Sequence, residues 1–361
     1  MTMNFSKYFG VSLDDVLQIK QETRELMTDD RHAAARRTLD AVSPSTSLAI
    51  RSALLEKTHL MQSEMGHIQR ISTIRDGRTW FAQREDVVLN FMAEPLNFRD
   101  AAVWTMFMAT LEATTEFQIH HCITEAKEDR LTGNLIGLWG SQCRQWGKRM
   151  IKVLKGQRSE LLLHELDLSI GGGEQADGGD FGVILDFEGM TGASGGAPVR
   201  HIVPLVLQAK RYQRPTADIS HISAGIIKQR TLLQSNPCAS AYIFYENAKE
   251  GIAHPLPALV KAAAAVGSAN RTDVLTDSLD LASYLLVVLA DPSLGIRAQS
   301  PKDALNMIYD RASFNKLSAL MVVSSDGTAG PRYQNACSEV VVERAQDYEP
   351  PEEEYEPPIP T

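Results

Sequence analysis

The chain contains two short apolar segments, GGDFGVILDF at Gly178–Phe187 and LVLQAKRY at Leu205–Tyr212. Each follows a glycine-rich or proline-containing stretch, and this pattern predicts buried β-strands. Asp180 stands near the start of the first segment, and the second reaches Gln208 and Lys210 near its end. Because side chains alternate along a strand, we expect Gln208 and Lys210 on the same face of a sheet. If the two strands are neighbours, a carboxylate, an amide and an ammonium group converge at one sheet edge.

Apolar spacing along the rest of the chain predicts a mixed α/β core. Period-two spacing predicts further strands at Glu160–Ile170, Ala239–Tyr245 and Ala319–Val323. The apolar run His201–Lys210 contains Pro204, so its strand is expected to start near Leu205. Helical spacing predicts one or two helices over Glu125–Gln157, interrupted near Thr132–Gly133, and further helices over Ile219–Gln234, Pro257–Ala265, Leu279–Ala290 and Pro301–Ser313. The expected fold class is therefore α/β, with a small mixed sheet flanked by helices.

Four regions are expected along the 361 residues. Residues 1–115 read as a helical accessory region, whose apolar stripe Trp104, Phe107, Met108 and Leu111 predicts core packing. Residues 116–250 hold the α/β core, and residues 251–342 form a mostly helical extension. Residues 343–361 are acidic and rich in proline, which predicts a disordered tail.

Composition places the chain among ordinary globular proteins. Hydrophobic residues make up 43% and charged residues 22% of the sequence, which excludes a collagen-like, coiled-coil or mostly disordered chain. The longest apolar run, Leu281–Ala290, is about half as long as a bilayer-spanning helix, and no secretory signal is visible. We therefore expect a soluble, cytoplasmic protein with no membrane partner. The four cysteines form no CxxC pair, which argues against a zinc ribbon and favours reduced, buried thiols.

The net charge of −9 argues against a nucleic-acid partner only at first sight. Six acidic residues lie in the last segment, Asp347–Thr361, which contains no basic residue. A basic run spans Arg144–Arg158 on a predicted helix and includes Lys148, Arg149 and Lys152. A solvated helix face is the default interpretation of this run, and contact with phosphate groups is the alternative.

The polar groups expected at the strand ends suit metal-assisted phosphodiester hydrolysis. Asp180 would hold Mg²⁺ (or Mn²⁺) through an anionic oxygen, and Gln208 would offer a neutral oxygen. The metal would polarise the phosphate and make a hydroxide available. Lys210 would orient the attacking water and offset the developing charge. Asp186 is a rival for the first acid, because it faces the same side as Asp180 in a regular strand.

These motifs resemble the PD-(D/E)xK, or restriction-endonuclease-like, nuclease superfamily, and most closely its Mrr-like branch with glutamine in the third motif. GGDFGVILDF is similar to the first strand motif and QAKR to the third, as in bacterial proteins with a GADW-type first motif. The acidic helix start of those proteins is matched by EDRLT at Glu128–Thr132, their glutamine-bearing helix by Gln229, and their aromatic strand by YIFY at Tyr242–Tyr245. The resemblance covers Glu125–Asn247, about a third of the chain.

The resemblance implies a restriction-endonuclease-like core and a metal-dependent endonuclease. Its substrate would be nucleic acid, with DNA favoured, and its role bacterial restriction or antiviral defence. Glu128 would be the helical acid of the metal site, Asp180 the principal ligand and Gln208 the third-motif ligand. Lys210 would be the catalytic lysine, and Gln229 would face the site or the DNA.

The match departs from the family in two places. The gap of 28 residues from Asp180 to Gln208 is longer than the compact hairpin usual in the superfamily. The glycine-rich segment Gly189–Pro198 can absorb that length at little cost, because loop-closure entropy grows slowly. Phe181 replaces the tryptophan of the GADW motif. Asp180 is favoured over Asp186 as the first acid, because the GGD that contains Asp180 matches the position of GAD in the GADW motif.

Other functions stay open. A degenerate nuclease fold could serve as a catalytically inactive binding or assembly subunit, although the intact Asp180, Gln208 and Lys210 set argues against it. The acidic tail could mimic DNA and hold the site shut. The helical flanks would recognise a trigger, DNA, a protein partner or a second copy of the chain. Arg211, which follows the motif lysine, is a further candidate for contact with nucleic acid.

Overall fold

The structure is a computed structural model. It describes residues 101–156, 158–166, 181–190, 199–214, 216–220, 222–223, 227–251, 255, 258–274, 278–290, 294, 296–309, 317 and 319–347. The expectations for residues 1–100, for Asp180 and for residues 348–361 of the acidic tail lie outside these ranges.

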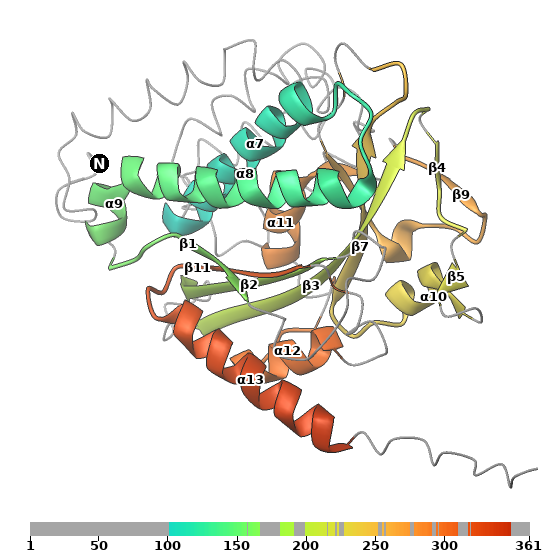
Figure 1. The fold of residues 1–361 in the computed structure, drawn as a ribbon. Coiled ribbons are helices and arrows are strands. Elements are labelled where there is room, and N and C mark those ends of the chain that lie inside the picture. Colours follow the sequence, from blue (N-terminus) through green and yellow to red (C-terminus); the bar gives the residue numbers. More distant parts are fainter. Residues whose placement is uncertain are drawn as a thin grey trace, which may run out of the picture.

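The centre of the fold is a seven-stranded sheet with the order β1-β11-β2-β3-β7-β8-β10. Its strands are β1 (Leu162–Leu166), β2 (Phe181–Met190), β3 (Val199–Tyr212), β7 (Ala239–Glu246), β8 (Leu259–Ala262), β10 (Leu279–Asp280) and β11 (Ala319–Ser324). The pairs β11–β2 and β3–β7 are parallel and the other pairs are antiparallel. An α/β fold with a mixed sheet flanked by helices is therefore confirmed (Figure 1).

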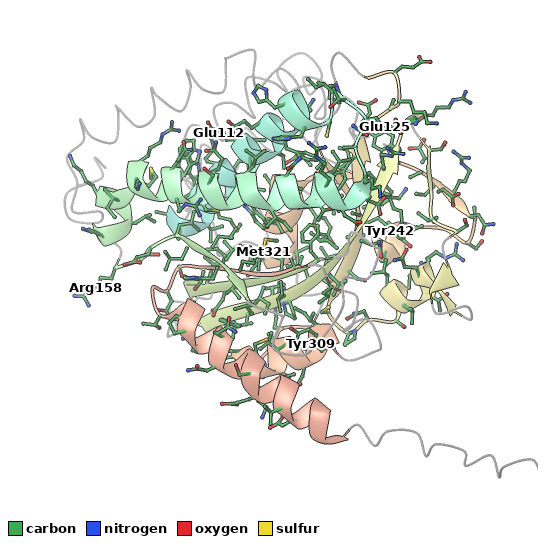
Figure 2. All side chains as sticks on the ribbon, viewed as in Figure 1. Glu112, Glu125, Arg158, Tyr242, Tyr309 and Met321 are labelled. Carbon is green, nitrogen blue, oxygen red and sulfur yellow. The ribbon has the colours of Figure 1, made fainter. Side chains whose placement is uncertain are left out.

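Helices cover both faces of this sheet (Figure 1). The first, here called the α8 face, packs against α7 (Ala101–His121), α8 (Glu128–Arg149) and α11 (Leu281–Ala290). The second, here called the α13 face, packs against α12 (Pro301–Tyr309) and α13 (Ala329–Asp347). Strand alternation divides the core accordingly: Met321 of β11 lies on the α8 face, and Tyr309 of α12 packs on the α13 face (Figure 2).

Helix α7 is buried on all sides over residues 101–114 rather than along one stripe. Trp104, Phe107, Met108 and Leu111 are buried, which confirms their expected place in the core. The buried hydroxyls of α7 bond to carbonyls one turn back, as Thr110 Oγ1 does to Met106 O at 2.8 Å. Neighbouring α8 adds a bond from Trp139 Nε1 to Thr110 Oγ1 at 2.8 Å. No helix within the described ranges is long and apolar enough to cross a membrane.

The helix expected over Glu125–Gln157 is present, but the interruption expected near Thr132–Gly133 is wrong. Helix α8 is continuous to Arg149, and the break falls at Met150, before α9 (Ile151–Gly156). Thr132 is buried, and its hydroxyl lies 3.3 Å from the Tyr245 hydroxyl on β7. Gly133 faces outward, where an added Cβ would meet nothing within 4 Å. Tertiary packing therefore outweighs the low helix propensity of this pair.

Two other expected helices are wrong. Within Ile219–Gln234, the described residues form two short paired strands, β5 (Ile222–Ser223) and β6 (Ile227–Lys228), and the helix is confined to α10 (Gln229–Gln234). Isoleucine is β-branched and favours extended backbone, which suits these strands. The segment expected as Pro257–Ala265 contains β8 and a 3₁₀ turn at Ala263–Ala265, because its apolar residues complete the sheet beside β7.

The expected start of β3 near Leu205 is also wrong, because the strand begins at Val199. Pro204 pairs with Ile184 of β2. On the other side, the ladder to β7 begins only at Leu205, so the missing N–H of Pro204 interrupts no registered pair there. Strand β3 therefore begins well before Gln208.

A smaller two-stranded sheet follows β3. It pairs β4 (Thr216–Asp218) with β9 (Arg271–Asp273) in antiparallel register. Pro301 occupies the first position of α12, as expected for a residue without an N–H. Helix α13 was not predicted from the sequence.

Candidate functional site

The end of β3 carries the two polar motif residues on one face of the sheet. Val206 and Tyr212, at even positions of the strand, belong to the core of the α13 face, whereas Ala209 belongs to that of the α8 face. Gln208 and Lys210 share the even parity and therefore point to the α13 face. This agrees with the alternation read from the sequence. Gln208 is fully buried, and the Lys210 side chain is 15% exposed.

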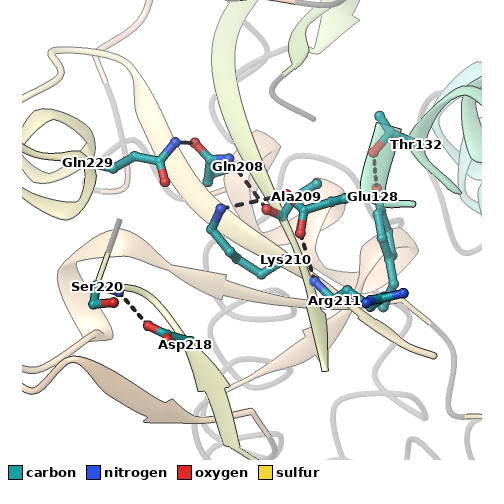
Figure 3. Close-up of polar contacts among 10 residues, drawn as sticks. Glu128, Thr132, Gln208, Ala209, Lys210, Arg211, Asp218, Ser220 and Gln229 are labelled. Carbon is teal, nitrogen blue, oxygen red and sulfur yellow. Dashed lines mark hydrogen bonds and ion pairs between the residues drawn. The ribbon is translucent and has the colours of Figure 1, made fainter. Parts of the chain in front are cut away.

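Glu128 meets Lys210 at this strand end. It is the first residue of α8, and its Oε1 lies 3.6 Å from Lys210 Nζ (Figure 3). Its other oxygen, Oε2, accepts the backbone N–H of Arg211 at 2.9 Å. A carboxylate in the first turn of a helix is favoured by the helix dipole. The Glu128 carboxylate is thus stabilised by the dipole of α8, by the Lys210 ammonium group and by the Arg211 N–H of β3.

Gln229 meets Gln208 from the other side. It opens the short helix α10, and its Nε2 donates to Gln208 Oε1 (Figure 3). Gln208 Nε2 in turn lies 3.4 Å from the carbonyl of Ala209. Two other α10 side chains fix the helix: Arg230 bonds to the carbonyls of Gly267 and Ala269, and Gln234 to those of Ala263 and Val266. The position of Gln229 therefore depends on the segment that follows β8.

Two side chains fix the loop that leads into Glu128. Asn247 is fully buried; its Nδ2 donates to the carbonyls of Cys122 and Thr124, and its Oδ1 accepts the N–H of Ala126 at 3.0 Å. Arg211 Nη1 donates to Ala126 O at 2.8 Å and lies 3.4 Å from Glu125 Oε1. Beside these contacts is a surface hollow of about 790 Å³, lined by residues 125–130 and Arg211.

Asp218 is a neighbour of Lys210 that sequence reasoning missed. It is exposed on β4, and its Oδ1 accepts the Ser220 N–H at 2.8 Å. Hydrogen bonds from Ser220 hold the pKa of the Asp218 carboxyl below its ordinary value, and the positive charges of Arg271 and Lys210 add to this effect. A three-residue strand leaves no periodic pattern, so local spacing does not predict this placement.

Of the two candidates for the first acid, the structure describes only Asp186. Its carboxylate is fully buried on β2 and lies 3.1 Å from Arg332 Nη2 of α13. Asp186 pairs with Ile202, six residues before Gln208, which is about 20 Å along the strand. The structure thus does not bring Asp186 to Gln208 and Lys210. Among the described residues, no group of three or more His, Cys, Asp or Glu side chains is arranged to hold a metal ion.

The basic residues proposed for phosphate contact lie away from this strand end. Lys148 and Arg149 are in the last turn of α8, and Lys152 is in α9. Lys148 is twenty residues from Glu128 along the helix, about 30 Å at 1.5 Å per residue. Arg149 Nη1 lies 3.5 Å from Glu112 Oε2, and its guanidinium stands 5.0 Å from the centre of the Trp146 ring.

Comparison with known proteins adds no relative, since no family model, no curated protein and no solved structure matches the chain. The arrangement therefore has to be interpreted from its own chemistry.

Proposed function

We propose that the protein is a metal-dependent nuclease that hydrolyses phosphodiester bonds of nucleic acid, with DNA as the favoured substrate. The observation that carries the proposal is the meeting of Glu128, Gln208, Lys210 and Gln229 at the end of β3. They come from three elements and from distant parts of the chain. A restriction-endonuclease-like core, and a role against foreign DNA, belong to the same proposal through the resemblance of these motifs.

Asp180 is proposed as the principal acid. Its chain neighbour Phe181 pairs with Leu207, which directly precedes Gln208. By contrast, Asp186 has a structural partner in Arg332.

The donor types at this strand end fit Mg²⁺ or Mn²⁺. Glu128 supplies a carboxylate and Gln208 an amide oxygen, and hard divalent cations take both in proteins. With Asp180 they would hold the ion. When bound, such an ion supplies positive charge to the phosphodiester and lowers the pKa of an attacking water. A soft-metal site is not supported, because the described cysteines are buried elsewhere in the core.

Lys210 is proposed to act directly on the phosphodiester. Its ammonium group is largely screened from water, so its charge acts on a nearby phosphate more strongly than in bulk solvent. Glu128 keeps that ammonium at the strand end, and the N–H of Arg211 fixes Glu128 in turn. Gln229 orients the Gln208 amide, so that its oxygen is presented from a defined direction.

The test is cleavage of plasmid, single-stranded DNA and RNA by the full chain, with Mg²⁺ or Mn²⁺ and with chelator. Lys210→Ala is expected to lower the rate about 100-fold or more, by loss of a charge that stabilises the transition state. Chelator is expected to abolish cleavage by the wild type, and Asp180→Ala is expected to abolish it even with metal present. Lys302→Ala, which removes an exposed lysine on α12, serves as the matched control and should cleave normally. Activity retained in both site variants would falsify the assignment.

One observation favours a second candidate, a catalytically inactive binding or assembly subunit. Gln208 is fully buried, and both oxygens of Glu128 already have partners within the chain. Wild-type protein that binds nucleic acid or a partner but cleaves none of the three substrates with either metal would support this candidate. Any chelator-sensitive cleavage that Lys210→Ala abolishes would exclude it.

A further inference from the structure

The loop that precedes α8 is held at Ala126, two residues before Glu128. The Ala126 N–H donates to Asn247 Oδ1 at 3.0 Å, and the Ala126 carbonyl accepts a hydrogen bond from Arg211 Nη1 at 2.8 Å. Arg211 is the last residue but one of β3, and Asn247 directly follows the parallel strand β7. Both backbone groups of Ala126 are therefore bonded to side chains from the same end of two neighbouring strands.

These bonds take the place of a side-chain cap at the start of α8. Lys127 occupies the N-cap position, and no side-chain hydrogen bond caps the helix there. Helices commonly begin at Ser, Thr, Asp or Asn, because these side chains accept an N–H of the first turn. A lysine ammonium has no acceptor and cannot do so. The position of the first turn, which carries Glu128, therefore depends on the tertiary bonds to Ala126.

Arg211 contacts the start of α8 through both its backbone and its side chain. Its backbone N–H donates to Glu128 Oε2 at 2.9 Å (Figure 3), and its guanidinium donates to the Ala126 carbonyl, two residues earlier. The same Nη1 atom lies 3.4 Å from Glu125 Oε1. One residue of β3 therefore fixes the loop that enters the helix and orients the carboxylate that follows it.

The Arg211 side chain lies on the other face of β3 from Gln208 and Lys210. It shares the odd parity of Ala209, which belongs to the core of the α8 face. The Arg211 side chain is 30% exposed, and its Nη1 already contacts a carbonyl and a carboxylate of the loop. A phosphodiester that meets Lys210 would therefore lie across the strand from the Arg211 guanidinium.

We propose that Arg211 is a positioning residue, which holds Glu128 beside Lys210 by fixing the Ala126 carbonyl, and that it makes no contact with nucleic acid. The inference rests on the proposed nuclease function and deepens it, because it assigns a supporting role to a residue outside the set of ligands. Every substitution at position 211 other than proline keeps the backbone N–H that binds Glu128. Side-chain variants therefore test the contacts of the guanidinium and not the backbone bond. Loss of a group that orients a metal-binding carboxylate lowers metal affinity about 10–100-fold.

The test measures Mn²⁺ binding to the full chain, by electron paramagnetic resonance of the free ion, and binding of a linear DNA duplex in chelator, by fluorescence anisotropy. Arg211→Met keeps an unbranched side chain and loses every N–H donor, so its Mn²⁺ affinity should fall about tenfold or more. Its salt slope of DNA binding should stay unchanged, whereas loss of a phosphate contact would lower the slope by about 0.9. Arg211→Lys, which restores a charge and a donor, should bind Mn²⁺ with an affinity between those of Arg211→Met and the wild type. Arg214→Ala removes an exposed arginine further along the chain, and this control should bind Mn²⁺ as the wild type does.

A double variant with Glu128 separates a positioning role from a general loss of stability. If Arg211 acts through Glu128, Arg211→Met/Glu128→Ala binds Mn²⁺ as weakly as Glu128→Ala alone. Equal Mn²⁺ affinity of Arg211→Met and the wild type overturns the proposal, and so does a further loss in the double variant. A lowered salt slope in Arg211→Met also overturns it, because Arg211 is then a phosphate contact. The proposed function fails separately, when Lys210→Ala and Asp180→Ala retain cleavage, so the two failures are distinguishable.

Discussion

The fully buried carboxylate of Asp186 lies 3.1 Å from Arg332 Nη2, so helix α13 neutralises a charge within the central sheet. Arg332 Nη1 also lies 3.0 Å from Asp326 Oδ2. Arg332→Ala would leave the Asp186 charge in the core without this partner. We expect a loss of about 3–5 kcal/mol in the free energy of unfolding, measured by urea denaturation. A variant as stable as the wild type would show that Asp186 does not depend on this pair.

Glu128 makes an ion pair with Lys210 and accepts the Arg211 N–H, and two different substitutions distinguish the effects of these contacts. Glu128→Gln keeps an oxygen that can accept the Arg211 N–H but loses the charge beside Lys210. Glu128→Ala loses both, and should be less stable than Glu128→Gln by about 1 kcal/mol. If Glu128 contributes to the metal site, both variants should need about 10–100-fold more Mg²⁺ for half-maximal cleavage. An unchanged Mg²⁺ requirement in Glu128→Gln would reduce Glu128 to a structural residue.

Asn247 should act at a distance on the same acid. Its buried amide makes three hydrogen bonds to the loop before α8, so Asn247→Ala leaves two carbonyls and one N–H without their partner. We expect a loss of about 2–4 kcal/mol in unfolding free energy. Thermal and urea unfolding test this, with Asn306→Ala on α12 as the control. Equal stability of the two variants would contradict the role given to Asn247.

The four cysteines should resist thiol reagents while the protein is folded. All four are buried, and burial raises the pKa of the Cys143 and Cys238 thiols to about 12. Because the thiolate is the reactive form, almost none is present at pH 8. A disulfide-exchange reagent should therefore label no cysteine quickly in native protein and four in denaturant. Rapid labelling of the native chain would mean that the core around these residues opens.

Stability should fall as the solution is acidified below about pH 6.5. Burial lowers the pKa of His164 from its ordinary 6.5, and its Nε2 has no hydrogen-bond partner among the described residues. Between pH 6.5 and the lower pKa of His164 in the folded chain, the unfolded chain binds a proton that the folded chain does not. Acidification through this range therefore lowers the free energy of unfolding. His164→Gln should flatten the dependence of melting temperature on pH. His121, whose pKa burial also lowers, accounts for part of the slope, so the double variant should be flatter still.

Local patterns predicted the parts of the fold that depend on neighbouring residues. Strands β2, β3, β7 and β11 and the shared face of Gln208 and Lys210 follow from alternation over a few residues. The segment at Leu259–Ala262 was read as helical, because only the neighbouring β7 makes it a strand. Tertiary pairing of this kind is not encoded in local spacing.

The candidate site was only partly predictable for the same reason. Glu128 and Lys210 are 82 residues apart, and the resemblance of the motifs, not any periodicity, suggested that they belong together. The placement of Asp218 near Lys210 left no pattern in the sequence. The basic run looked close to the site along the chain, yet a straight helix carries Lys148 about 30 Å from Glu128.

Strand β11 pairs with β1 on one side and with β2 on the other. A ribosome therefore releases both of these partners well before it makes the strand that joins them. The growing chain has to keep two unpaired strand edges apart from other proteins until residue 324 has emerged. Premature termination ahead of Ala319 would leave that gap permanently open, and the resulting fragments would be prone to aggregate.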